Sequence, residues 1–230
     1  MSSAPPLSVS GLDIGRGPIA FEVGPGGVLA VLGDNGSGKS LLLAHLSGHL
    51  RVPKGSVKVG GRELRAALSD VGVVFQHTGL IRNMTVFENI ALPFLVHGLD
   101  LDGVVEEKVR LRMRLVGCAH LENEEVHRLS EGDKRCVALA RALSGPTRLL
   151  IADEPVAALA PAKKALVEEL LASLVRTGVL TGIVLATQDL DFARRIATHF
   201  LILHPGGHTL ISRGDAARNE HYLTFASRAS

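Results

Sequence analysis

The chain has 230 residues, of which 46% are hydrophobic and 21% charged, a composition that fits one globular domain with a substantial core. Its 25 basic and 23 acidic residues nearly balance and only 3% of residues are aromatic, so we expect no nucleic-acid partner. We expect no signal peptide, and no stretch approaches the roughly 18 apolar residues of a membrane span. If the protein works at a membrane, another chain must supply the spans.

The order of the predicted elements indicates an α/β fold. Apolar runs before residue 77 predict strands, and near-continuous apolar runs after residue 147 are typical of parallel strands buried on both faces. Between about 78 and 143 the apolar spacing becomes helical, and a further helix should begin near Pro161. The predicted strands cover residues 7–9, 19–23, 28–32, 55–61, 71–75, 148–152, 182–186, 200–203 and 209–211.

These elements predict a single domain over residues 1–230. An α/β core is expected roughly over 1–77 and 144–214, interrupted by a helical insertion roughly over 78–143. The tail 215–230 is polar and shows no clear pattern.

One short segment between a predicted strand and a predicted helix has the phosphate-binding pattern G-x-x-x-x-G-K-[ST]. Backbone N–H groups of such a loop converge on phosphate, and the dipole of the following helix favours negative charge there. We expect Lys39 to reach the β- and γ-phosphates and the Ser40 hydroxyl to hold Mg²⁺. The alternative is a flexible glycine loop that matches by chance. The predicted nucleotide-binding residues of this loop are Gly33, Asp34, Asn35, Gly36, Ser37, Gly38, Lys39 and Ser40.

An acidic pair at the end of a later apolar strand completes this chemistry. Asp153 ends the strand and is expected to hold Mg²⁺, directly or through water. Glu154 follows it and is expected to orient and deprotonate the attacking water. The alternative is an acidic pair that only caps the turn before Pro155.

Together these motifs resemble the ATP-binding-cassette (ABC) family, the P-loop ATPase subunits of ABC transporters, over nearly the whole chain. The resemblance implies an ABC-cassette α/β core with N-terminal antiparallel strands and a helical insertion, and ATP and Mg²⁺ as cofactors. Gln76 looks like the glutamine that touches Mg²⁺ and the water in that family and relays the nucleotide state to a membrane subunit. The segment Leu129–Asp133 looks like the signature sequence, so Ser130 and Gly132 are expected to bind ATP held by a second cassette.

The resemblance also implies partners and a location. We expect an integral membrane permease and a second ABC subunit, identical or different, with this chain peripheral on the cytoplasmic face of the cell membrane. The segment 75–93 is similar to ATPases of mammalian-cell-entry-type lipid transport, and also to those of amino-acid importers and lipoprotein-release systems. Lipid transport is therefore a further expectation.

Four departures from the family pattern bear on hydrolysis. Gln188 stands where the family has a switch histidine, and it can hydrogen-bond a phosphate but cannot carry positive charge. The loop 157–160 lacks the usual serine and aspartate. Glu131 replaces a signature glycine, unless Ser130 and Asp133 form a helix cap and Glu131 faces solvent. The expected adenine-stacking aromatic is absent, and Arg16 is its candidate substitute.

These departures predict slow or asymmetric ATP hydrolysis, with Glu154, Gln188 and Gln76 as the catalytic residues. Two other functions remain open: a regulatory ATP-binding subunit with little turnover, and a non-transport ABC protein acting on DNA or ribosomes.

Overall fold

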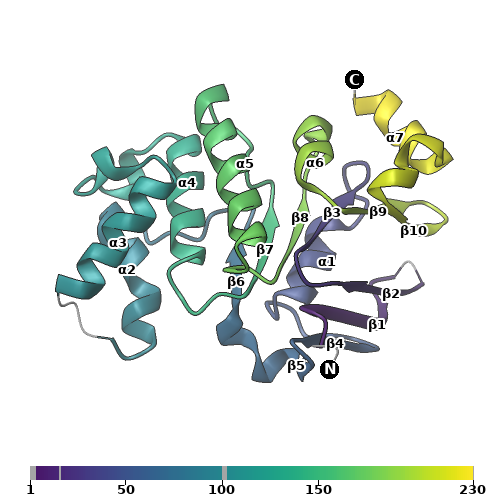
Figure 1. Cartoon of the computed structure of the whole chain (residues 1–230), viewed down its shortest axis with the longest axis horizontal. Coiled ribbons are helices and arrows are strands. Elements are labelled where there is room, and N and C mark those ends of the chain that lie inside the picture. Colours follow the sequence, from purple (N-terminus) through teal and green to yellow (C-terminus); the bar gives the residue numbers. More distant parts are fainter. Residues whose placement is uncertain (1–3, 16, 100–102, 230) are drawn as a thin grey trace.

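The computed structural model describes residues 4–15, 17–99 and 103–229. Its strands form two sheets with helices packed around them (Figure 1). The helices of the described chain are α1 (Lys39–Leu46), α2 (Val86–Val96), α3 (Gly103–Leu115), α4 (Glu131–Ala142), α5 (Pro161–Arg176), α6 (Leu190–Ile196) and α7 (Glu220–Ala229). Short 3₁₀ segments are η1 (Leu64–Ala66), η2 (Leu68–Asp70), η3 (Ala119–Leu121), η4 (Val126–Arg128) and η5 (Arg213–Arg218).

The smaller sheet is antiparallel and has the strand order β2-β1-β4-β5. Leu7 of β1 pairs with Val23 of β2 on one side and with Val59 of β4 on the other, and all three side chains are buried. The alternation of buried and exposed residues along β2 explains why one face of this sheet packs against the core. Its strands are β1 (Leu7–Asp13), β2 (Pro18–Val23), β4 (Ser56–Val59) and β5 (Arg62–Glu63).

The larger sheet has the order β10-β9-β3-β8-β7-β6 and is parallel except for β10, which pairs antiparallel with β9. Because the carboxyl ends of parallel strands lie at one edge of a sheet, the loops after β3, β6, β7 and β8 meet there. That edge carries the predicted nucleotide chemistry. The strands are β3 (Gly27–Leu32), β6 (Val71–Val74), β7 (Leu149–Asp153), β8 (Gly182–Ala186), β9 (His199–His204) and β10 (Gly207–Ser212).

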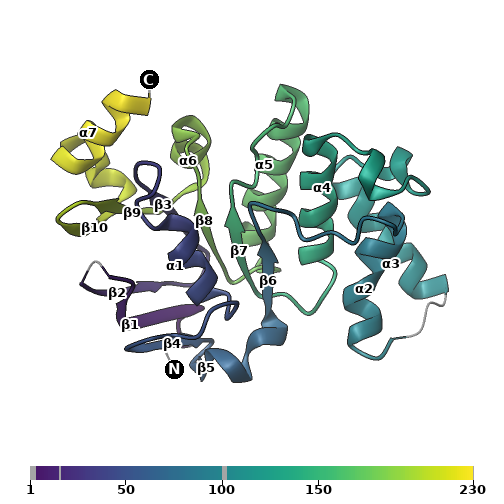
Figure 2. The same ribbon diagram turned by 180° about the vertical axis from the view of Figure 1, so that it is seen from behind.

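Successive residues of the central strands face two different layers of the core. Leu29 and Val31 of β3 belong to the cluster that contains α1 and the smaller sheet. Val28 and Ala30 belong to the cluster that contains α5 and α6. Figures 1 and 2 show the same arrangement, with α5 and α6 on one face of the larger sheet and α1 on the other. Burial on both faces accounts for the continuous apolar runs in these strands.

The helices α2, α3 and α4 pack together at the end of the molecule opposite α7 (Figure 1). Thr85 and Glu88 form a capping box that starts α2. Asn89 is fully buried and its side chain exchanges hydrogen bonds with the backbone of Ile81 at 2.8 and 3.0 Å, which holds the segment before α2 in place. The division of the chain into a core, an insertion and a tail stays a prediction.

The C-terminal segment differs from the sequence expectation. It is not patternless: it forms η5 and α7, and Tyr222 and Phe225 of α7 are buried against the rest of the protein. Tyr222 packs on Phe200 of β9 with ring centroids 5.1 Å apart, and Arg194 of α6 donates to its hydroxyl at 2.8 Å. This end of the chain is therefore part of the fold. In the described ranges, no helix combines the length and apolar character needed to cross a bilayer.

Candidate nucleotide site

The loop between β3 and α1 needs glycine at defined positions. Gly33 has a φ of 147°, and a Cβ there would lie 2.6 Å from the carbonyl oxygen of Leu203. Gly38 has a φ of 96° and precedes α1 directly, a left-handed conformation that favours glycine. The sequence pattern therefore reflects backbone geometry at these two positions.

The start of α1 fits an anionic ligand. Its first turn contains no acidic residue and receives no side-chain cap, so backbone N–H groups at this helix end are not used by a cap. The hydroxyl oxygen of Ser37 is buried and has no hydrogen-bond partner among the residues that the structure describes. Such groups are what a bound phosphate would satisfy.

Lys39 folds back over this loop. It is 7% exposed, and its Nζ donates to the carbonyl oxygens of Gly33 at 2.7 Å and Asp34 at 3.1 Å. Burial lowers the pKa of Lys39, whereas the charges of Glu154, Asp153 and Asp34 oppose that shift. A buried cation at the start of α1 is suited to bind a phosphate.

The predicted metal ligands come together on one side of the phosphate loop. Ser40, Gln76 and Asp153 line the same cavity of about 430 Å³. Their donor set of a hydroxyl, an amide and a carboxylate is the oxygen chemistry that Mg²⁺ prefers, and it leaves room for phosphate oxygens. The residues present therefore fit Mg²⁺ bound with a nucleotide.

Glu154 is held in a defined orientation beside them. Its carboxylate accepts a hydrogen bond from the Thr187 hydroxyl at 3.0 Å and another from the backbone N–H of Gln188 at 2.8 Å. Burial raises the pKa of Glu154, and these two hydrogen bonds oppose the shift. Its φ of 51° is unusual for a residue with a side chain and marks a backbone fixed by its surroundings.

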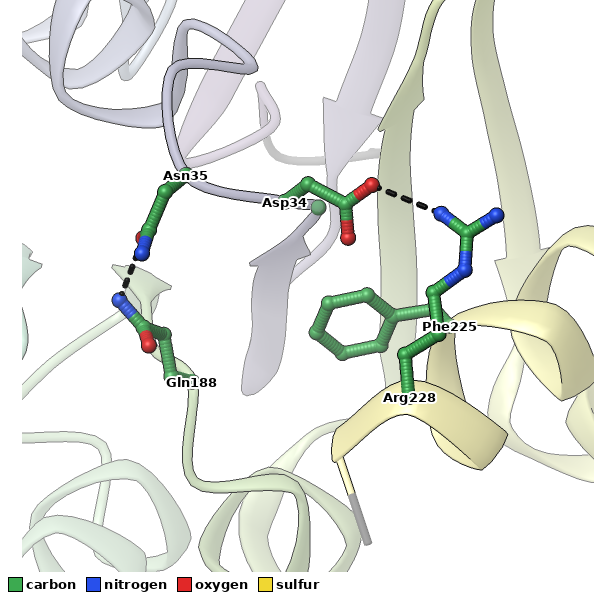
Figure 3. Close-up of a pocket in the computed structure, with 6 residues that line it drawn as sticks. Asp34, Asn35, Gln188, Phe225 and Arg228 are labelled. Atoms are coloured by element: carbon green, nitrogen blue, oxygen red, sulfur yellow. Dashed lines mark hydrogen bonds and ion pairs between the residues drawn. The ribbon is translucent and has the colours of Figure 1, made fainter.

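Gln188 connects two loops of the site. Its side-chain Nε2 donates to the Oδ1 of Asn35 at 2.8 Å (Figure 3). The structure thus brings Gln188, Glu154 and the phosphate loop together at the same edge of the sheet.

Two residues of the site carried no predicted role there. Arg135 of α4 is 7% exposed, and its guanidinium donates to the carbonyl oxygens of Phe75, Gln76 and Asp153 at 3.2 to 3.3 Å. Thr187 binds the carboxylate of Glu154. Thr187 directly precedes the predicted Gln188, which is the only signal that the sequence offered for it.

Ser130 and Gly132 lie at the start of α4 and contact different neighbours. The Ser130 hydroxyl caps α4 by accepting from the backbone N–H of Asp133 at 3.1 Å. A Cβ on Gly132 would lie 2.7 Å from the carbonyl oxygen of Ala158. The Glu131 side chain is 72% exposed and pairs with Lys134, in agreement with the helix-cap interpretation of this segment.

The loop 157–160 lacks its expected polar residues, but the helix that follows it is tied to both sides of the site. Lys163 of α5 pairs with Asp133 of α4, and Lys164 pairs with Asp189, the residue after Gln188.

A further cavity, of about 590 Å³, lies beside Gly36 and Gly38 of the loop. Ile14 and Gly15 line it together with the turn 205–207. Arg16, the candidate for stacking on adenine, lies outside the described residues. Phe21 is buried in the smaller sheet.

The fold and the phosphate loop define a P-loop ATPase of the ATP-binding-cassette class. Solved structures agree: an ATP-binding subunit of an ABC transporter superposes with a TM-score of 0.84 over 96% of this chain and 99% of that chain at 24% identity. A dimeric ATP-binding cassette bound to ADP and Pi superposes with a TM-score of 0.82 over 90% of this chain and 98% of that chain, at 22% identity. At these identities the likeness establishes the fold, which confirms the predicted fold class.

Sequence comparison gives the family. Residues 17–157 match the ABC transporter family. The ATP-binding protein TupC of the tungstate uptake system of Peptoclostridium acidaminophilum is 35% identical over 82% of this chain and 86% of its own length. The methionine import ATP-binding protein MetN of Cereibacter sphaeroides is 37% identical over 81% of this chain, which spans 54% of that protein. The chain belongs to the ABC transporter family, as one of its ATP-binding subunits.

Family membership fixes the cofactors and the kind of partners. The cassette binds ATP with Mg²⁺, for which the loop 33–40 and the cavity beside it have the required groups. ATP-binding subunits of this family work with a membrane permease and a second cassette.

Proposed function

We propose that this chain is the ATP-hydrolysing subunit of an uptake transporter, bound to the cytoplasmic face of a permease and paired with a second cassette. The observation that carries the proposal is the convergence of four loops at one sheet edge, with Ser40, Gln76 and Asp153 on one cavity and Glu154 beside it. The names of the relatives, which are a tungstate uptake protein and methionine importers, support uptake as the direction.

Each residue has a proposed task. Lys39 and the N-terminus of α1 bind the phosphates, and Ser40, Gln76 and Asp153 hold Mg²⁺. Bound Mg²⁺ neutralises charge that develops on the phosphates. Glu154 accepts the proton of the attacking water, a task that its raised pKa suits. Gln188 hydrogen-bonds the terminal phosphate.

Ser130 and Gly132 are proposed to act on the second cassette. The Ser130 hydroxyl caps the N-terminus of α4, where backbone N–H groups and the helix dipole favour an anion. A pair of subunits would each contribute this end of α4 to the nucleotide of the other.

We propose that hydrolysis is slow without the permease. A glutamine at position 188 offers the terminal phosphate a neutral donor in place of a charged one, which weakens transition-state stabilisation. Its amide is also engaged by Asn35. A regulatory subunit with little turnover is the second candidate, and the same two observations favour it.

The transported solute is proposed from the relatives alone. Tungstate and methionine are both small polar solutes, so we propose a small polar solute for this transporter. The lipid-transport expectation has no support among these relatives.

The test is ATPase activity with and without the permease. The tagged chain is purified from its host membranes in detergent, co-purifying permease subunits are identified, and turnover is measured for the complex in liposomes and for the isolated chain. We expect ATP binding by both and a rate at least tenfold higher for the complex. Glu154→Gln should abolish turnover and keep ATP binding. Equal slow rates for both would favour the regulatory candidate, and fast turnover by the isolated chain would contradict slow hydrolysis.

A further inference from the structure

The C-terminal helix α7 reaches the phosphate loop. It is anchored by Tyr222 and Phe225, and His221 stacks on His204 of β9 with ring centroids 4.1 Å apart. These contacts fix the direction of the helix, so that its last turn lies beside residues 33–35 (Figure 3).

Arg228 in that last turn pairs with an acidic residue of the phosphate loop. Its Nη1 lies 2.9 Å from the Oδ2 of Asp34. Together with Asn35, Phe225 and Gln188, these two residues line a cavity of about 350 Å³. The cavity thus joins the phosphate loop, the position of the missing switch histidine and the C-terminal helix.

The ion pair between Arg228 and Asp34 is too exposed to stabilise the fold. The side chains of Arg228 and Asp34 are 63% and 56% exposed, and ion pairs with such exposure contribute little to folding. The contacts of Tyr222 and Phe225 already anchor the helix. The main effect of the pair is therefore on the charge beside the phosphate loop.

Asp34 brings a negative charge to a loop that binds an anion. Lys39 interacts with the charges of three carboxylates, Asp34 among them. An unpaired carboxylate at this position repels phosphate, and the repulsion grows with the charge of the ligand. Arg228 offsets that charge on the side of the loop where Gln188 replaces a histidine.

We infer that Arg228 is a specificity-determining residue of the nucleotide site, which favours the triphosphate over the diphosphate by neutralising Asp34. The inference rests on the proposed ATP-hydrolysing function. Because the triphosphate carries more negative charge than the diphosphate, loss of Arg228 costs ATP more affinity than ADP.

The experiment compares ATP and ADP affinities by titration calorimetry in Mg²⁺ for the wild type and four variants of the full chain. Arg228→Ala should raise the Kd for ATP about three- to tenfold and that for ADP only about two- to threefold, as expected for one partly screened charge acting on ligands of different charge. Arg228→Lys should keep most of the ATP affinity. Adding Asp34→Asn to Arg228→Ala should restore it, because the repelling charge is then gone. Arg218→Ala removes an exposed arginine just before α7 and is the matched control.

The outcomes separate the inference from the proposed function. Equal losses for ATP and ADP, no recovery in the double variant, or the same effect in Arg218→Ala would overturn the inference. Tighter ATP binding by Arg228→Ala would also overturn it, since Arg228 would then obstruct the site. Failure of the wild type to bind nucleotide would contradict the proposed function itself. Thermal unfolding without nucleotide should be unchanged in Arg228→Ala, which confirms that the fold is intact.

Discussion

Gln188 and Asn35 are joined by a side-chain hydrogen bond of 2.8 Å that connects the loop after β8 to the phosphate loop. The backbone N–H of the same Gln188 donates to the carboxylate of Glu154 at 2.8 Å. One residue thus holds both the proposed catalytic base and the loop that binds the phosphates. A side-chain change at position 188 leaves the backbone N–H bond to Glu154 in place and removes the proposed donor to the terminal phosphate, so it should affect turnover more than nucleotide affinity.

Replacing Gln188 tests this directly. Gln188→His should raise kcat about tenfold, because a cationic donor lowers the barrier by ~1.4 kcal/mol more than a neutral one. Gln188→Ala should lower kcat about tenfold with little change in KM. The measurement is steady-state phosphate release. Asn35→Ala is the control, since it removes the hydrogen bond to Gln188 but keeps the glutamine. Wild-type rates in Gln188→Ala would refute the role of Gln188 as donor to the terminal phosphate.

Arg135 should be required for the stability of the site. Its guanidinium donates to three carbonyl oxygens from two loops, so Arg135→Ala leaves one buried and two part-buried acceptors unsatisfied and should cost about 2–4 kcal/mol of unfolding free energy. Arg135→Lys, which lacks the planar fork, should cost roughly half of that. Urea unfolding measures both. The exposed Arg128→Ala should stay within about 0.5 kcal/mol of the wild type; a similar loss there would mean that the contacts of Arg135 are not the cause.

Gly132 should resist a side chain. A Cβ would lie 2.7 Å from a backbone oxygen of Ala158, which no rotamer change can relieve. Gly132→Ala should destabilise the protein by about 1–2 kcal/mol even after the gain in helix propensity. Thermal or urea unfolding tests it, with the exposed neighbour Glu131→Ala expected to change stability by less than about 1 kcal/mol. A neutral Gly132→Ala would show that the loop at Ala158 yields easily.

The parts of the site that could be predicted are those whose position follows from local sequence. The loop 33–40 needs glycine at fixed positions. Asp153 ends a strand whose apolar run identifies it as buried, and Glu154 follows directly. Parallel pairing then brings both to one edge of the sheet. The α/β class was predicted from the same periodicity, and the likeness to solved structures confirms the fold class.

Arg135, Thr187 and α7 were not predicted because their roles depend on distant contacts. Arg135 donates to the carbonyl oxygens of Phe75 and Gln76, which lie 60 and 59 residues earlier in the chain. Thr187 reaches Glu154 because β7 and β8 pair side by side, with Asp153 opposite Ala186. In α7, Tyr222 and Phe225 are three residues apart and mark one apolar face, but the polar composition around them obscured this spacing.

The packing of α7 should depend on pH through His204. Burial, together with the charges of His221 and His208, lowers the pKa of His204 below its ordinary 6.5. The folded protein therefore binds this proton less tightly than the unfolded chain, so the free energy of unfolding falls as the pH drops below about 6.5. In the wild type, the Nε2 of His204 lies 3.1 Å from the Thr209 hydroxyl oxygen. His204→Gln keeps a hydrogen-bonding partner for that hydroxyl but has no titrating group. We expect urea unfolding between pH 5 and 8 to show a shallower decline for this variant than for the wild type. His120→Gln, an exposed histidine on η3, should follow the wild type, and an unchanged slope in His204→Gln would assign the decline to other groups.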